Sequence, residues 1–529
     1  MTDMKKAFSL TLIIMASILF ISSCSDKNSD ISTDNTETSQ TEEYTPEFGG
    51  TIKLASFVPD TLNPLATQYQ NVRDVLMVVY EGLFKAESDL SATPVIASGY
   101  SVSVSNKIYT IKIRQGIQFH DGKQLDSKDV IATFDYIKKY DTPYTEMFKN
   151  VLSYKATDNH TVSIELISPQ ANFINNLDFP ILPKGLSKES FVSENPYFVP
   201  IGTGRFKYDS QVKNKYMTYT RFDNWYGEKE TYIDNVRINF LHNSQDIFHA
   251  FDSGEIDIFT TNGSNWGEFT FTSETKIYET PSPRYTFIGI NTENEQLKES
   301  SLRRDINAAL NRKELIENIM FNHAIPANLP IIVYEDEGKE NAQTNISPEK
   351  DDEEENYLRA PEFNKYDISL YLLYNKESKE KARAAEHIKK ALEQYGIKLL
   401  MQEVDFEDYK NRIAEKNYDL YIGEVVMQNN MNMDFMFNSL HETEQKLCTF
   451  KNAEFDTLLN NLNMINSSNE NSDIIYENFK KYFYQNVPQI PLFHTNTAIF
   501  VNNRIKGNIT PNMSSFYSDI GDFYINYKQ

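Results

Sequence analysis

The sequence predicts an α/β protein, because segments typical of strands alternate with segments typical of helices over several hundred residues. Alternation of apolar and polar residues, as in a half-buried strand, is clearest at 109–114 and 162–166. Apolar stripes with helical spacing occur at 130–137, 302–320 and 385–395. A chain of 529 residues is long enough for two or more domains, each with its own core.

The order of elements follows from local signals along the chain. Ordered structure is expected to begin near Gly49, where Ile52 and Leu54 alternate with other residues as in a strand. A turn at Asp158-Asn159 precedes the strand at 162–166.

The predicted helices have recognisable ends. Asp126, with Asp129 three residues later, has the spacing of an N-cap and a capping-box partner. Gly396 follows the third stripe at the C′ position of a helix, and 397–401 then has the pattern of a strand. Arg303 and Arg304 are expected on the exposed face of the helix that carries the second stripe.

The first 24 residues have the features of an export signal. Lys5 and Lys6 precede an apolar stretch at 7–21, which is too short for a comfortable membrane span. Small residues then precede Cys24, a pattern that resembles the lipobox of bacterial lipoproteins. The resemblance implies cleavage before Cys24 and acylation of that residue, and several acyl chains anchor a protein stably. The alternative is an ordinary signal peptide with an incidental cysteine.

Composition narrows the classes of partner and of fold. The net charge of -23 argues against nucleic acid and against adhesion to anionic lipid. If Cys24 is lipidated, Cys448 has no partner, which excludes a disulfide framework and favours a small buried apolar role for Cys448. Residues 25–46 are polar and predict a flexible tether, while 335–356 predicts a solvated acidic loop, with a cation site as the minor alternative.

The sequence contains no clear catalytic motif. The segment at 251–254 lacks the spacing of a nucleophile elbow, and glycine-rich phosphate-binding loops do not occur. His441 and Glu442 begin like the helix of a zinc protease, but Gln445 stands where the second histidine should be. We therefore expect no catalytic residue, no metal and no cofactor, and a binding function is favoured over an enzyme.

Short motifs occur in a fixed order from about Gly49 to the end of the chain. They are Asp60-Thr61-Leu62-Asn63-Pro64, Tyr80-Glu81-Gly82-Leu83, Tyr109-Thr110-Ile111-Lys112-Ile113-Arg114, Phe119-His120-Asp121-Gly122-Lys123, Pro200-Ile201-Gly202-Thr203-Gly204, Gly254-Glu255-Ile256-Asp257 and Pro488-Gln489-Ile490-Pro491-Leu492. The ordered set resembles the family 5 extracellular solute-binding proteins, which serve peptide and nickel ABC importers.

The resemblance implies a two-lobed, periplasmic-binding-protein-like α/β fold. Two crossing strands would form the hinge, one lobe would carry an extra domain, and the solute would bind between the lobes, which close by a hinge motion. The implied division is a signal peptide at 1–23, the lipidated cysteine and tether at 24–48, domain I at 49–89, 189–283 and 487–529, domain II at 90–188 and domain III at 284–486.

Candidate ligand-binding residues come partly from the resemblance. Gln68, Tyr69 and Gln70 align with a ligand-facing loop in peptide-binding relatives, and burial in the core is the alternative for Tyr69. The run Gly202-Thr203-Gly204 permits a close backbone approach, which suits either a hinge or a ligand. His120 lies beside an Asp-Gly turn, and a scaffold role is favoured for it over ligand contact.

Other candidates come from residue chemistry. Trp266 lies in a polar loop where a large ring is hard to bury, so we expect it to offer a broad face to a solute. Packing of the ring against its own lobe is the alternative. Asn429 and Asn430 supply amides, and Asp434 is the acid available for a ligand amine. Peptide importers of the family usually carry a tryptophan and an acid after the strand at 418–421; this chain has no tryptophan there, and Asp434 is the one plausible acid.

The favoured interpretation is the membrane-anchored substrate-binding subunit of an ABC importer. It would be a monomer on the extracytoplasmic face of a bacterial membrane that captures an oligopeptide and delivers it to the permease without chemical change. A nickel chelate or an oligosaccharide bound by the same fold is the first alternative. A tethered surface enzyme or adhesion module is the second.

Overall fold

The computed structural model describes residues 46–87, 91–170, 172–192, 198–262, 270–272, 274–331, 359–427, 430, 432–439, 447–465, 472–509 and 516–527. All of these lie in the unit Pro46–Gln529. Cys24, Trp266, Asn429 and the acidic segment 335–356 fall outside the described residues, so the expectations for them remain predictions.

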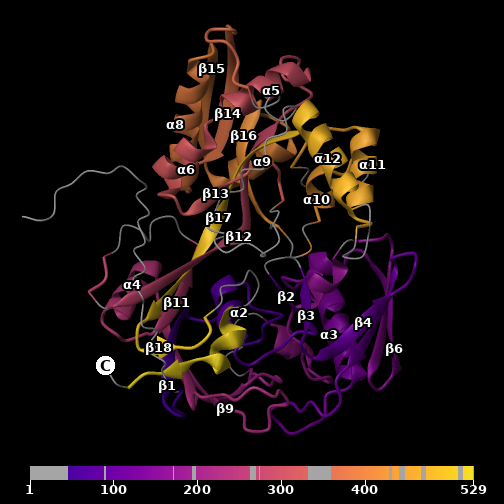
Figure 1. Cartoon of the computed structure of the whole chain (residues 1–529), viewed down its shortest axis with the longest axis vertical. Coiled ribbons are helices and arrows are strands. Elements are labelled where there is room, and N and C mark those ends of the chain that lie inside the picture. The colour runs from indigo at the N-terminus through magenta and orange to yellow at the C-terminus, as the bar shows by residue number, and fades with distance from the viewer. Residues whose placement is uncertain are drawn as a thin grey trace, which may run out of the picture. The chain divides into compact units, whose positions relative to one another are not determined.

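An 11-stranded mixed sheet is the largest element of this unit (Figure 1). Its order is β15-β14-β16-β12-β17-β11-β1-β10-β9-β8, and β13 pairs with β17. The strands are β1 Thr51–Phe57, β8 Phe206–Val212, β9 Tyr216–Arg221, β10 Asn235–Leu241, β11 Ile258–Thr261, β12 Thr275–Ile290, β13 Ala324–Pro326, β14 Ile368–Asn375, β15 Ile397–Val404, β16 Leu420–Val426 and β17 Gln489–Asn502.

The long antiparallel strands β12 and β17 connect two portions of this sheet. Their register shifts between Pro281 and Tyr285, an irregularity that lets a strand pair bend. On the side of the shift that holds the N-terminal half of β12, β17 also pairs with β11. On the other side, β12 also pairs with β16. Separate hydrophobic clusters lie along the two portions, one containing Val501 and the other Ile290.

A second, four-stranded antiparallel sheet has the order β4-β5-β7-β6. Its strands are β4 Ala97–Val102, β5 Ile108–Ile113, β6 Val151–Asp158 and β7 Thr161–Leu166, and helix α3, Ser127–Lys139, packs against β6 and β7. The strands predicted at 109–114 and 162–166 are confirmed as β5 and β7. In each of them the apolar side chains of the alternating pattern are buried.

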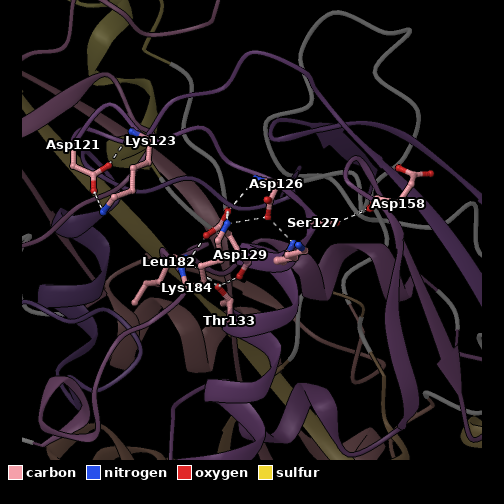
Figure 2. Close-up of polar contacts among 10 residues, drawn as sticks. Asp121, Lys123, Asp126, Ser127, Asp129, Thr133, Asp158, Leu182 and Lys184 are labelled. Atoms are coloured by element: carbon pink, nitrogen blue, oxygen red, sulfur yellow. Dashed lines mark hydrogen bonds and ion pairs between the residues drawn. The ribbon is translucent and has the colours of Figure 1, made fainter.

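Helix α3 begins with the predicted capping box. The Asp126 carboxylate accepts a hydrogen bond from the Lys128 N–H at 2.8 Å, and the Asp126 N–H donates to the Asp129 carboxylate at 2.9 Å. The ammonium of Lys184 lies 3.1 Å from both carboxylates (Figure 2). The segment around Lys184 is therefore fastened to the start of the helix.

Helices α8, Lys379–Glu393, and α9, Phe406–Ala414, pack on β14 (Figure 1). Gly396 has φ +81°, a left-handed conformation, but it lies two residues after the cap residue Gln394, one position later than the expected C′, and β15 follows it. The apolar stripe at 302–320 is two helices rather than one, α5 Ser300–Ala309 and α6 Arg312–Met320. The chain is extended at Leu310, and the Asn311 side chain then accepts from the Glu314 N–H and starts α6 as an N-cap.

The expected exposure of Arg303 is wrong, because this side chain is only 2% exposed. Its guanidinium donates to the carbonyl of Leu297 at 2.8 Å and to that of Asn486 at 2.5 Å. Asn486 is the last residue of helix α12, Ser472–Asn486, where carbonyls lack partners within the helix. A cation is favourable at that position, so Arg303 is held inside.

Cys448 is 7% exposed, and burial raises the pKa of its thiol to about 12. The prediction of a small buried residue is thereby confirmed. The remaining elements are β2 Phe84–Ala86, β3 Ala92–Pro94, β18 Ile505–Lys506, β19 Tyr524–Ile525, α2 Gln70–Leu76, α4 Ser244–Asp252, α10 Asp434–Phe437 and α11 Ala453–Leu462, with 3-10 helices at Thr145–Phe148, Phe173–Leu177, Lys188–Phe191 and Phe516–Asp522.

Candidate functional site

The loop that leads into α2 displays Gln68 and Tyr69 on the surface. Asp60 organises this loop, because its carboxylate accepts from the Thr67 hydroxyl at 2.5 Å and from the Gln68 N–H at 3.1 Å. Tyr69 is 49% exposed, so its ring does not belong to the core. The Asp60-centred loop thus presents an amide and a half-exposed ring side by side.

Gln70 connects two charged residues on the first turns of α2. Its amide nitrogen donates to Asp74 at 2.6 Å, and its amide oxygen accepts from Arg73 at 2.6 Å. Burial raises the pKa of Asp74 to about 6, although the Gln70 hydrogen bond and the Arg73 charge oppose the rise. Asp74 was not predicted from the sequence, although its i,i+4 spacing from Gln70 on a helix is a detectable signal.

The Gly202-Thr203-Gly204 loop packs against the chain's own segment at 79–81. A Cβ on Gly202 would lie 2.1 Å from the carbonyl oxygen of Val79, and the Gly204 N–H donates to that oxygen at 2.9 Å. Thr203 is fully buried, and its hydroxyl donates to Glu81 at 2.8 Å. Gly202 and Gly204 therefore permit a close approach of this loop to the backbone of Val79.

His120 completes this packing. Its Nε2 lies 2.9 Å from the Gly204 carbonyl oxygen, its Nδ1 accepts from the Gly202 N–H at 3.3 Å, and its own N–H donates to the Gly202 carbonyl. Burial lowers the pKa of His120 to about 4, so the ring is neutral at pH 7. These contacts are those of a scaffold residue.

Glu81 is the centre of a polar network that joins distant segments. Its carboxylate accepts from Thr203 and from the indole N–H of Trp225 at 3.0 Å. The guanidinium of Arg205 lies 4.2 Å from the Trp225 ring centre and forms an ion pair of 2.7 Å with Asp522. Burial raises the pKa of Glu81 to about 7, against the lowering effect of its hydrogen bonds and of Arg205.

Asn430 and Asp434 lie in a second polar segment, where α10 begins. Asn430 is 3% exposed; its amide oxygen accepts from the Asn432 N–H at 3.1 Å, while its amide nitrogen is buried without a partner in the described part of the chain. The Asp434 carboxylate accepts from Asn463 at 2.8 Å and from Asn438 at 3.4 Å. Amide groups thus hold the Asp434 carboxylate in place.

The candidate residues therefore fall into three groups, each held by its own hydrogen bonds. Gln68, Tyr69 and Gln70 lie at the start of α2, the Gly202–Gly204 loop lies on Glu81, and Asn430 and Asp434 lie at α10. In the described residues, no cluster of three or more histidine, cysteine, aspartate or glutamate side chains has the arrangement of a metal site. Nor does any described helix have the length and apolar character needed to cross a membrane.

The chain belongs to the bacterial extracellular solute-binding proteins of family 5, whose middle region matches residues 91–446. It is similar to the oligopeptide-binding protein AppA of Bacillus subtilis strain 168, with 23% identity over 531 residues that cover 95% of this chain and 96% of AppA. The structure of AppA with a nonapeptide covers 91% of this chain at 20% identity, with a TM-score of 0.64, and all of the AppA chain is matched.

Two further solved structures share the fold. The substrate-binding protein CtaP of Listeria monocytogenes covers 90% of this chain and is itself matched completely, with 20% identity and a TM-score of 0.72. NikZ of Campylobacter jejuni in complex with Ni(L-His) covers 91% of this chain and is likewise matched completely, with 19% identity and a TM-score of 0.64. The fold is the two-lobed α/β arrangement of the family 5 binding proteins, as the sequence predicted.

Proposed function

We propose that this protein is the lipid-anchored binding subunit of an ABC importer and that it captures an oligopeptide for delivery to the permease. The observation that carries the proposal is the similarity to oligopeptide-binding AppA over nearly the full length of both chains. A nickel chelate is the second candidate, because NikZ with bound Ni(L-His) has the same fold at a similar level of identity.

The proposed peptide site combines the α2 loop with the segment at α10. Gln68, Gln70 and Asn430 supply amide groups that suit the N–H and C=O groups of an extended peptide, a mode of recognition that tolerates different side chains. Asp434 supplies a negative charge for a peptide amine. Tyr69, half exposed, offers an aromatic surface between Gln68 and Gln70 in the chain.

Trp266, Asn429 and the loop Gly202-Thr203-Gly204 complete the proposed site. Trp266 would stack on the bound solute, and Asn429 would add an amide beside Asn430. For the glycine loop we favour the hinge role, because Thr203 is buried and its hydroxyl is bonded to Glu81. Closure would then leave the packing of this loop on Val79 intact.

Anchoring through Cys24 and the domain division at 49–89, 90–188, 189–283, 284–486 and 487–529 belong to the same proposal. Metabolic labelling with a fatty acid should mark the wild-type chain and leave Cys24→Ala unmarked. Equal labelling of both proteins would contradict the anchor. The ligand should also be released unchanged, so recovery of peptide fragments in excess over protein would contradict a purely binding role.

The decisive experiment identifies the solute. The purified full chain is loaded from a random peptide pool and, separately, with Ni(L-His), and the bound material is identified by native mass spectrometry. Retention of peptides with a stoichiometry of one supports the proposal, whereas retention of the nickel complex alone favours the second candidate.

Calorimetry with a retained peptide then locates the site. The double variant Gln68→Ala/Gln70→Ala should bind more weakly, whereas Gln124→Ala, an exposed glutamine elsewhere, should bind as the wild type does. Equal affinity of the double variant and the wild type would reject the α2 loop.

A further inference from the structure

A cavity of about 550 Å³ lies at one end of the four-stranded sheet, among residues that the proposed peptide site does not use. The start of β4, the end of β5 and the turn between β6 and β7 form its walls. It is lined by Ser98, Lys112, Ile113, Arg114, Gln115, Asp158, His160 and Thr161.

The lining carries more positive than negative charge, although the chain as a whole carries -23. Lys112 and Arg114 are permanent cations at pH 7, and Asp158 is the single acid. The Asp158 carboxylate accepts from the His160 N–H at 2.8 Å, and this hydrogen bond, followed by that of Thr161, lowers the pKa of Asp158. The Asp158 carboxylate is therefore already hydrogen-bonded within the turn between β6 and β7.

Both cations are held in place by neighbouring polar groups. The Lys112 ammonium donates to the Thr161 hydroxyl at 2.9 Å. The Arg114 guanidinium donates through Nε to the Val95 carbonyl at 2.7 Å and through Nη2 to the Pro94 carbonyl at 3.4 Å. These hydrogen bonds leave both charges in place. Asp158 partly balances the charge of Lys112, which helps to lower the pKa of Asp158, so the lining combines fixed donors with a net positive charge.

The turn between β6 and β7 also contains a buried nitrogen that lacks a hydrogen-bond partner in the described part of the chain. Nδ1 of His160 is buried and has no hydrogen-bond partner in the described part of the chain. Its backbone is fixed, because the His160 carbonyl accepts from the Ile113 N–H at 2.8 Å. Ser127 at the start of α3 holds the same turn, since its hydroxyl donates to the Asp158 carbonyl at 2.5 Å (Figure 2).

We propose that this cavity binds a small oxyanion of the phosphate or carboxylate class. Lys112 and Arg114 supply charge-assisted donors to the anion. A metal cation is disfavoured, because the lining carries the positive charges of Lys112 and Arg114 and its one acid, Asp158, already accepts a hydrogen bond. We take a freely diffusing oxyanion as the source, and a lipid headgroup with the same chemistry is the alternative that the test distinguishes. The proposal is independent of the importer function.

The test uses the full chain with Cys24→Ser in every sample, so that no acyl chain contributes. Inorganic phosphate and acetate are titrated by calorimetry, while NMR follows the imidazole signals of His160, assigned by their loss in His160→Asn. We expect saturable binding that moves the His160 signals. Lys112→Gln and Arg114→Gln should each weaken binding about tenfold or more, the effect of losing one charged hydrogen bond.

Matched variants separate a site from general charge effects. Lys155→Gln removes an exposed lysine from β6, outside the cavity lining, and should leave affinity unchanged. Lys112→Arg keeps the charge and should retain binding, which shows that Lys112→Gln acts through charge rather than folding. The proposal is overturned if neither anion binds saturably, or if the cavity variants and Lys155→Gln weaken binding equally.

Sedimentation with phosphatidylglycerol and phosphatidylcholine vesicles distinguishes the source of the oxyanion. Binding to phosphatidylglycerol vesicles that is lost in Lys112→Gln identifies a lipid headgroup as the occupant. Saturable phosphate binding without vesicle binding identifies a free oxyanion. Both results support the cavity as an oxyanion site, and the absence of both refutes it.

Discussion

Replacing Arg303 with methionine should destabilise the protein strongly, although the helical pattern of the sequence places Arg303 on an exposed face. The side chain is 2% exposed, and within the described residues its guanidinium donates only to carbonyl oxygens, those of Leu297, Lys298, Asn486 and Val487, at 2.5 to 3.1 Å. Burial lowers the pKa of Arg303 to about 10, so the group remains charged at pH 7. Methionine fills a similar volume but supplies no donor.

The magnitude follows from the acceptors left behind. Two of the four carbonyls belong to the C-terminal end of α12 and the residue after it, where no helical N–H is available. Leaving a buried acceptor unsatisfied costs about 1–3 kcal/mol, and such penalties are less than additive when the site relaxes. We therefore expect Arg303→Met to reduce the free energy of unfolding by about 3–5 kcal/mol, in the range measured for breaking buried charged networks.

Urea unfolding followed by circular dichroism measures this change, and hydrogen exchange locates it. Exchange should accelerate in α5 and α12 before it does so in the four-stranded sheet. Arg304→Met is the matched control, because Arg304 is partly buried and bonds to Ser300 and to the Gln485 carbonyl; it should cost about 1 kcal/mol. Equal losses for the two variants would refute the argument from the buried carbonyls.

Three further predictions concern the Glu81 network, the glycine loop and the ligand. The pKa of Glu81 is about 7 in the folded state against 4.5 ordinarily, so the native state binds this proton more tightly and stability should fall as pH rises from about 4.5 to 7. Glu81→Gln should remove this fall, about 3 kcal/mol, in urea unfolding at a series of pH values, and an unchanged profile would contradict it. In urea unfolding, Gly202→Ala should destabilise the protein by about 2–4 kcal/mol, because its Cβ would meet the Val79 carbonyl. Gly254→Ala, at φ +72° in open space, should cost about 1 kcal/mol in the same assay, and equal costs would show that packing is not the cause. Asp434→Asn should weaken binding of a peptide with a free amine by about 1.5–3 kcal/mol in calorimetry and leave an N-acetylated peptide unaffected, so equal losses for both peptides would place the amine elsewhere.

Local chemistry in the sequence was sufficient for much of the fold. The Asp126 and Asp129 pair predicted the start of α3, because a capping box is formed by residues three apart in the chain. Alternating residues predicted β5 and β7, because the period of a strand decides which side chains reach the core. The ordered motifs identified the family, since their arrangement extends over nearly the whole chain.

The tertiary structure decided which distant segments meet. Arg303 has the helical position of an exposed residue, yet packing of α5 against α12 encloses it and supplies its acceptors. The partner of Thr203 is Glu81, more than a hundred residues earlier, and Lys112 meets Thr161 only because β5 pairs with β7. Sequence periodicity specifies which face of an element is apolar, whereas strand order and helix packing determine which polar groups that face encloses. For this reason the elements were predictable and the buried polar partners were not.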